Sequence, residues 1–259
     1  MTDHPTSTRR PIADISLRKV ALIAGIGLLL MALLAPFAKF GVLQTLVVPA
    51  DAAATVENII ASEGLFRAAI AAFLIVIMLD VVVAWALYVL LSPVNRTLAL
   101  LTAWLRLAFA AVFAYALVNL LDVAQLLGSA EVSTLPPEQL QAQVMSSLVS
   151  FDNGWIGIAL AIFGLHLLMD GYLLFRSAHF PRFLGVLVVI AGGGYLVDSF
   201  ATILVSDYVL SIASFTFVGE ALLIFWLFWR AIKGFPSELQ RPDGEATEQR
   251  LPQPAPLIP

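Results

Sequence analysis

The chain has 259 residues, of which 60% are hydrophobic and only 12% are charged. Soluble domains carry about 25% charged residues, so this composition excludes an ordinary water-soluble globule, which would be left with large apolar patches on its surface. The net charge of −4 and the dispersed basic residues do not indicate nucleic-acid binding. The absence of cysteine excludes disulfides, thiolate metal sites and thiol nucleophiles.

Six apolar stretches are long enough to cross a bilayer as helices, which requires about 20 residues each. Their apolar runs are continuous and do not alternate, as barrel strands would. We expect Pro36 to kink or end the first span. The chain is therefore predicted to be an all-α polytopic membrane protein with a six-helix transmembrane domain at residues 18–236. The spans cover residues 20–40, 65–91, 97–121, 155–175, 183–205 and 208–232.

The distribution of lysine and arginine predicts the orientation of the chain, because these residues mark cytoplasmic segments. They gather in the N-terminal segment, in the turns after the second and fourth spans, and at the C-terminal end, whereas loops 41–64 and 122–154 have none. Both termini are therefore predicted to be cytoplasmic, in a multi-pass protein of the cell inner (plasma) membrane. Lys39 and Arg67 run against this rule, but both can snorkel to headgroups.

The first span has a basic flank, but its apolar stretch is long for a signal peptide and no convincing cleavage site follows. We interpret it as a retained anchor. We expect residues 1–17 to form a poorly ordered cytoplasmic segment, and residues 237–259 to form a disordered cytoplasmic tail because they are polar and proline-rich.

Both long outer loops contain signals for a short helix. Asp51 precedes the stretch AAATVENII, and Ser133 or Thr134 can cap a helix that opens with proline and glutamate. We expect an amphipathic helix lying across the outer mouth of the bundle; the alternative is a lid over a cavity. The apolar face of the second helix would consist of Leu140, Val144 and Leu148.

Ionisable residues inside the predicted spans form the candidate site, because such residues are costly in a bilayer and usually face the bundle interior. From a helical rise of 1.5 Å per residue, four of them lie roughly 14–18 Å from the cytoplasmic ends of their spans. These four are Asp80, Arg106, His166 and Glu220, whereas Asp170 lies nearer the cytoplasm and Asp198 nearer the outside.

Two pairs are expected within this layer. Asp80 and Arg106 lie at equal depth on consecutive antiparallel helices, so we expect an ion pair; the alternative to a functional role is a structural pair that fixes the two helices together. His166 and Asp170 are four residues apart and share a helix face, where the carboxylate can orient the imidazole. The small patch Gly192–Gly194 predicts close helix packing.

The charge balance of the layer suggests a function. Four carboxylates face one arginine and one histidine, and they cannot all be ionised and unpaired away from water. At least one must hold a proton, unless the site binds a cation or admits water. We expect Glu220 to be protonated or cation-bound at neutral pH, because Arg106 is paired with Asp80.

The chain resembles an uncharacterised bacterial membrane family, domain-of-unknown-function family 4386 (DUF4386), over nearly all of residues 18–235. The resemblance implies a six-span inner-membrane protein, and it implies no activity or catalytic residues. All of the candidate residues except Asp170 lie in segments that match the family pattern clearly. The stretches that carry it include KVALIAGIGLLL, LYVLLSPVNRTLALLTAWLRL, GEALLIFWLFWRAIKG and, most specifically, YLLFRSAHFPRFLG.

The predicted function is to bind or translocate a proton, a cation or a small polar solute through this layer, with the lipid bilayer as the other partner. One alternative is an intramembrane enzyme, such as a metal-assisted hydrolase using His166 and nearby carboxylates. Another is a structural or partner-binding protein whose polar residues fasten helices together. No cofactor or metal site is predicted, because one histidine without cysteine is a thin ligand set for zinc, and the common catalytic motifs are missing.

Overall fold

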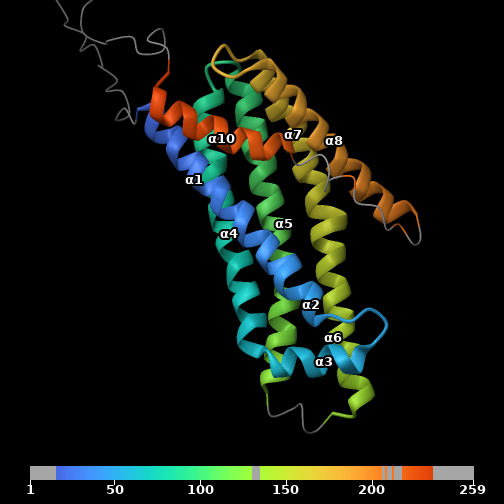
Figure 1. The fold of residues 1–259 in the computed structure, drawn as a ribbon. Helices are drawn as coiled ribbons and strands as arrows, with labels where there is room; N and C mark the ends of the chain where they lie inside the picture. Colours follow the sequence, from blue (N-terminus) through green and yellow to red (C-terminus); the bar gives the residue numbers. More distant parts are fainter. Residues whose placement is uncertain (1–15, 130–134, 206–207, 209–211, 213–217, 236–259) are drawn as a thin grey trace, which may run out of the picture.

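The computed structural model describes residues 16–129, 135–205, 208, 212 and 218–235, and this part of the chain is helical, without strands. Figure 1 shows the helices gathered into an elongated bundle. Five continuous helices are long and apolar enough to cross a membrane, which confirms the all-α polytopic class. They are Leu17–Leu46, Glu63–Leu91, Arg96–Gly128, Pro137–Arg176 and Arg182–Leu204.

The first long helix consists of α1 (Leu17–Pro36), a π-helical stretch Phe37–Leu43 and the short α2 (Gln44–Leu46). Pro36 does not end this helix. Because proline has no N–H to donate, the regular hydrogen-bond pattern is interrupted, and the chain continues through wider turns. The helix thus changes its hydrogen-bond pattern after Pro36 and continues to Leu46.

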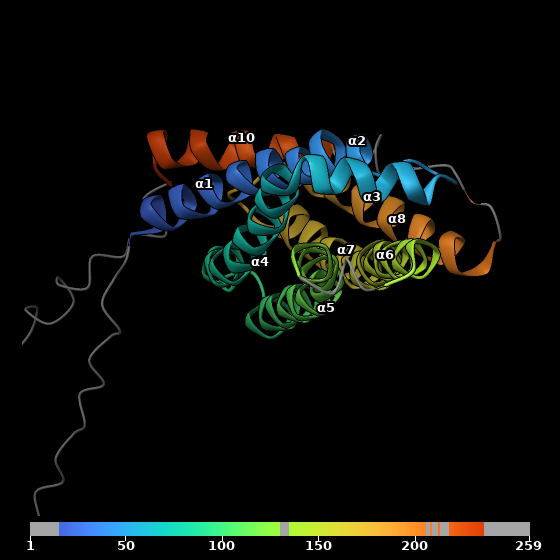
Figure 2. The same ribbon diagram turned by 90° about the horizontal axis from the view of Figure 1, so that it is seen from below.

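The predicted helix after Asp51 is present as α3 (Ala52–Ala61). The Asp51 carboxylate accepts a hydrogen bond from the Ala54 N–H at 2.9 Å and caps the first turn. Viewed from the side and from below, α3 runs across one end of the bundle (Figure 1, Figure 2).

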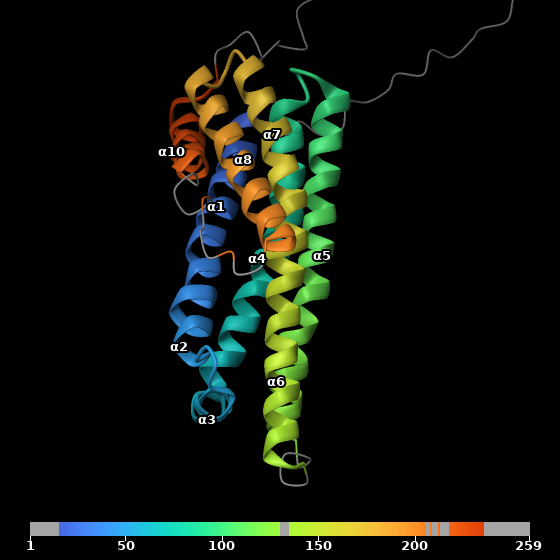
Figure 3. The same ribbon diagram turned by 90° about the vertical axis from the view of Figure 1, so that its right-hand side faces the viewer.

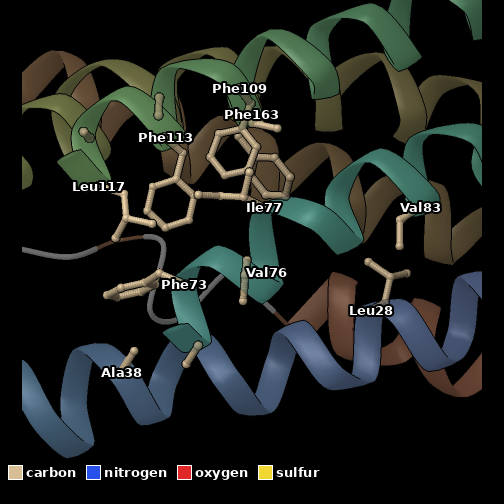
Figure 4. Close-up of a cluster of buried hydrophobic side chains, with 14 of the residues drawn as sticks. Leu28, Ala38, Phe73, Val76, Ile77, Val83, Phe109, Phe113, Leu117 and Phe163 are labelled. Carbon is tan, nitrogen blue, oxygen red and sulfur yellow. The ribbon is translucent and has the colours of Figure 1, made fainter. Parts of the chain in front are cut away.

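The next two helices, α4 (Glu63–Leu91) and α5 (Arg96–Gly128), form an antiparallel pair that packs along its length. Asn95 begins α5 by accepting a hydrogen bond from the Leu98 N–H at 3.0 Å. Phe73 on α4 and Phe113 on α5 meet edge to face, with ring centroids 5.5 Å apart, in the core shown in Figure 4. This pair positions the first two candidate residues.

The second outer loop differs from the prediction. The segment α6 (Pro137–Asp152) continues through the π-helical stretch Asn153–Ala159 into α7 (Leu160–Arg176), forming one helix of 40 residues. Figure 3 shows α6 running alongside α5, in line with α7, and not across the mouth of the bundle. Burial explains this arrangement, because α5 extends beyond the predicted span and offers α6 a surface along its length. The predicted apolar face of Leu140, Val144 and Leu148 is buried as expected.

The closest helix contact joins α7 to α8 (Arg182–Leu204). A Cβ atom placed on Gly171 would lie 2.7 Å from the Gly185 carbonyl oxygen, and one on Gly164 would lie 2.8 Å from that of Gly192. Glycine therefore allows the two backbones to touch at two levels. The predicted packing role is confirmed at Gly192, whereas Gly193 has nothing within 4 Å of its Cβ position.

The sixth predicted span is not confirmed. The described part of this segment is α10 (Val218–Lys233), which has 16 residues, and residues 213–217 before it lie outside the described part of the chain. Gly219 lies against the backbone of Leu187, near the beginning of α8. At the other end of α10, Arg18 of α1 donates to the carbonyl of Ala231 at 3.0 Å. Thus α10 lies across one half of the bundle, with its last residues beside the start of α1.

The expectations for residues 1–15, for a cap at Ser133 or Thr134, and for the tail at 237–259 fall outside the described residues. The described start of α6 follows Pro136 and has Pro137 as its first helical residue, where the missing N–H costs little.

Candidate functional site

Three of the long helices bring five polar side chains together in the interior. Each of these side chains belongs to a residue that is 2% exposed or less. Four of them were expected from the sequence, and the fifth was not. We call this group the polar cluster: Asp80 from α4, Thr102 and Arg106 from α5, and His166 and Asp170 from α7.

The predicted ion pair between Asp80 and Arg106 is present, with Arg106 Nη2 2.8 Å from Asp80 Oδ1. The two groups are close but poorly aligned. Among the described residues, neither carboxylate oxygen of Asp80 nor Nε of Arg106 has a hydrogen-bond partner. The pair is therefore held by its charges and keeps unused donor and acceptor capacity.

The contacts of His166 determine which of its ring nitrogens carries a proton. Nδ1 lies 2.9 Å from the carbonyl oxygen of Thr102, which can only accept, so Nδ1 must be the donor. Nε2 lies 3.2 Å from Nη1 of Arg106, and a guanidinium can only donate, so Nε2 is the acceptor there. By this assignment, the imidazole is neutral and has its proton on Nδ1.

Asp170 completes the cluster and approaches the same ring nitrogen of His166 that Arg106 contacts. Its Oδ1 accepts a hydrogen bond from the Thr102 hydroxyl at 2.8 Å, and its Oδ2 lies 3.4 Å from Nε2 of His166. Two bare lone pairs would repel each other at this distance in a medium of low dielectric. One proton placed between Oδ2 and Nε2 removes that repulsion.

Aromatic and sulfur groups surround the charged atoms. The guanidinium of Arg106 lies 5.4 Å from the centre of the Phe163 ring, and Phe163 also packs against the His166 ring at 5.6 Å. Nη2 of Arg106 lies 3.9 Å from the sulfur of Met31. These neighbours offer weak contacts to a cation and little hydration, so the charges within the cluster depend mainly on one another.

The two remaining candidate residues lie outside the cluster. Glu220, at the start of α10, accepts a hydrogen bond from the Tyr195 hydroxyl at 3.0 Å. Its depth was predicted by counting from the cytoplasmic end of the sixth span, and its carboxylate lies close enough to Arg106 and Asp80 to interact with their charges. Asp198 accepts from the Tyr208 hydroxyl at 2.6 Å and from the Ile212 N–H at 2.9 Å. Asp198 thus fastens the connection after α8, and this hydrogen bond raises the pKa of the Tyr208 phenol.

Thr102 is the residue that sequence reasoning missed. It lies four residues before Arg106 on α5, so helical spacing places both on one face. Its hydroxyl and its carbonyl reach different residues of α7. The hydroxyl could have been suspected from this spacing, whereas the role of a backbone carbonyl leaves no mark in a sequence.

Both basic residues that run against the charge rule have partners. Nζ of Lys39 lies 2.6 Å from Oδ1 of Asp152, and Nε of Arg67 lies 2.7 Å from Oε1 of Glu63. Arg67 also donates to the carbonyl of Ala124 at 3.1 Å. These contacts give each cation a local counter-charge at its helix end.

A metal site would need several ligands pointing to one position. Within the described part of the chain, no three histidine, aspartate or glutamate residues converge in that way. In the polar cluster, the position beside Nε2 of His166 is taken by Arg106.

Comparison with known proteins gives the following. A family model described as "Domain of unknown function (DUF4386)" matches residues 23–231. An uncharacterised protein from Archaeoglobus fulgidus is 36% identical over 160 residues, which is 62% of this chain and 80% of that protein. No solved structure matches the chain. Because this relative is archaeal, the expectation of a bacterial family is not confirmed.

Proposed function

The chain belongs to the DUF4386 family. We propose that it is a membrane protein that holds one exchangeable proton between His166 and Asp170. One observation carries the proposal. Nε2 of His166 lies between a guanidinium that can only donate, at 3.2 Å, and a carboxylate oxygen, at 3.4 Å.

This proton has two possible positions, of which the first agrees with the contacts in the structure and the second requires Arg106 to release Nε2. With the proton on Asp170, Nε2 of His166 is free to accept from Arg106, which then bridges His166 and Asp80. With the proton on Nε2, the imidazolium pairs with Asp170 and can no longer accept from Arg106. Arg106 must then donate to Asp80 alone, whose oxygens have acceptor capacity to spare.

Movement of the proton between Asp170 and His166 thus determines whether Arg106 donates to His166 and Asp80 or to Asp80 alone. The net charge of the cluster is zero in both arrangements, because Asp80 balances Arg106 and the proton balances Asp170. The second arrangement buries two more charged groups than the first, and the attraction between the imidazolium and Asp170 must offset that cost. In the first arrangement Arg106 of α5 bonds to both α4 and α7, because Asp80 lies on α4 and His166 on α7. In the second it bonds to α4 alone, so the position of the proton changes which helices are joined.

Loss of the proton from the cluster would leave one uncompensated negative charge in the interior, which is costly. A cation that entered as the proton left would remove this cost. The function that we propose is therefore the exchange of a proton for a cation across the bilayer.

The placement of the protein in its membrane is also a proposal. Arg18, Arg96, Arg176, Arg182 and Arg230 all belong to the ends of helices or turns that we assign to the cytoplasm. This supports a multi-pass protein of the cell inner (plasma) membrane with both termini cytoplasmic.

Flux measurements on purified protein in liposomes test the proposal. A gradient of Na⁺ or K⁺ is applied, and the internal pH is followed with a trapped dye. We expect wild type and Glu63→Gln, a control at an exposed carboxylate on α4, to exchange protons for the cation, and Asp170→Asn to lose the exchange. Equal rates in Asp170→Asn and wild type, or rates in wild type no higher than in empty liposomes, would contradict the proposal.

A further inference from the structure

A pocket opens at the end of the bundle where α7 turns into α8. It has a volume of about 620 Å³, and a second pocket of about 350 Å³ adjoins it through shared residues of the same turn. The second pocket is also lined by Pro93 and Val94, from the turn between α4 and α5. Figure 3 shows both turns at the same end of the molecule. The first pocket is lined by Phe175, Arg176, Ser177, Ala178, Phe180 and Arg182.

Both charged side chains that line the first pocket are cationic. Arg176 and Arg182 both line it, and neither forms an ion pair with any carboxylate of the described residues. The guanidinium of Arg182 lies 5.8 Å from the centre of the Phe175 ring, which helps to hold it in place. Two planar guanidinium groups beside one cavity are suited to the oxygens of a phosphate group.

Hydrogen bonds from α10 fix the turn that carries these arginines. The carbonyl of His179 accepts hydrogen bonds from Nη2 of Arg230 at 3.0 Å and from Nε1 of Trp226 at 3.3 Å. The hydroxyl of Ser177, which is 6% exposed, accepts from the His179 N–H at 3.2 Å. The pocket is therefore built on a fixed backbone, which lowers the entropic cost of binding a ligand.

The surroundings of the pocket indicate the source of the phosphate. Phe175, Phe183 and Val186 continue from the pocket along the outside of α7 and α8, and they are 40%, 59% and 46% exposed. These apolar side chains lie on helices that are long and apolar enough to cross a membrane, where they would be next to acyl chains. A lipid can place its headgroup phosphate between the arginines and its chains along this surface, which free phosphate cannot do.

We propose that this pocket binds the phosphodiester of an anionic phospholipid through Arg176 and Arg182. Basic pockets between transmembrane helices are a recurring way of recognising lipid headgroups. The site is independent of the polar cluster, and it ties the α7–α8 turn, and with it the helix that carries His166 and Asp170, to the membrane surface.

Lipid retention tests this site directly. The purified protein is incubated with phosphatidylglycerol or phosphatidylcholine in detergent, and bound lipid is counted by native mass spectrometry. We expect wild type to keep phosphatidylglycerol preferentially, and Arg176→Gln with Arg182→Gln to keep about tenfold less, as the loss of a charge-assisted contact implies. Arg96→Gln is the matched control, because Arg96 is exposed at the same end but does not line the pocket.

Three outcomes separate the possibilities. Equal loss of phosphatidylglycerol in the Arg96 control and the double variant would contradict the proposal, because it would mean diffuse attraction to a basic surface. If inorganic phosphate at the same concentration as phosphatidylglycerol displaces the lipid, the proposal that the pocket binds a lipid would be contradicted. If circular dichroism shows that the double variant folds poorly, the variant Arg176→Lys with Arg182→Lys, which keeps both charges, replaces it. We expect this variant to retain an intermediate amount of phosphatidylglycerol. Retention equal to wild type would contradict recognition by the guanidinium groups.

Discussion

The ion pair between Asp80 and Arg106 can be tested through the free energy of unfolding. Both side chains are buried, and their closest atoms are 2.8 Å apart. Asp80→Asn leaves Arg106 with the neutral acceptor Nε2 of His166. Arg106→Gln leaves Asp80 without a cation among its described neighbours, so its carboxylate must either stay charged at a high cost or take up a proton. The second change should therefore be the more damaging of the two.

The expected magnitudes follow from the burial of the pair. Two charges about 4 Å apart attract by about 4 kcal/mol at an effective dielectric constant of about 20. Removing one partner of a buried pair costs about 3–5 kcal/mol, mostly because the other charge is stranded. We place Asp80→Asn near the lower end of this range and Arg106→Gln near its upper end. The double variant strands no charge, so the coupling energy between the two changes should be at least about 2 kcal/mol.

Unfolding by SDS in mixed micelles, followed by circular dichroism, gives the four free energies of this double-mutant cycle. The matched control is the pair Glu63 and Arg67, which lies on the same helix but is about half exposed. Its coupling energy should be below about 0.5 kcal/mol. If the effects of Asp80→Asn and Arg106→Gln simply add, or if the control pair couples as strongly, the reasoning about the buried pair is wrong.

Three further predictions address packing, orientation and pH. Gly171→Ala should destabilise by about 1–3 kcal/mol because its Cβ meets backbone at 2.7 Å, whereas Gly193→Ala, with nothing within 4 Å, should not; equal thermal shifts would contradict the glycine contact. Because the chain has no cysteine, Gly64→Cys and Thr97→Cys can be labelled selectively, and impermeant reagent on intact cells should reach only Gly64→Cys; the reverse would invert the orientation. The hydrogen bond from Tyr208 to the Asp198 carboxylate raises the pKa of the Tyr208 phenol. The stability that this bond contributes is therefore present below the ordinary tyrosine pKa of about 10 and is lost as pH rises through the raised pKa of the folded state. An ultraviolet difference titration against Tyr208→Phe should show a phenol that ionises at higher pH than free tyrosine, and ionisation at the pH of free tyrosine would contradict the prediction.

Long apolar runs made the five crossing helices predictable, because few other structures satisfy the backbone in a bilayer. The ion pair was predictable for a similar reason. Asp80 and Arg106 lie at equal distances from one short turn, and a regular helical rise turns those distances into equal depths. The same reasoning placed His166 and Asp170 on one face.

The sixth span is not confirmed by the described residues. Its described part, α10, begins at Val218, so the predicted start at residue 208 is not tested. Hydropathy alone cannot distinguish an apolar helix that crosses a membrane from one that lies against others. For the same reason, α6 was predicted as a separate surface helix, although its apolar face continues along α5 into α7.

The details that give the site its chemistry were the least accessible from the sequence. The tautomer of His166 depends on the carbonyl of Thr102 and on one nitrogen of Arg106. Such contacts depend on the rotation of each helix about its axis to within a fraction of a turn. Residue spacing within one helix does not determine that rotation, because neighbouring helices set it through their packing.

The shared proton is tested most directly by ¹⁵N NMR of histidine. His4→Gln with His179→Gln leaves His166 as the only histidine, so both of its ring nitrogens can be assigned in detergent or nanodiscs. The account predicts a protonated Nδ1 throughout, and an Nε2 that changes from acceptor to N–H as pH falls in this background but stays an acceptor when Asp170→Asn is added. A neutral ring protonated on Nε2, or an Nε2 signal that is indifferent to Asp170→Asn, would contradict it.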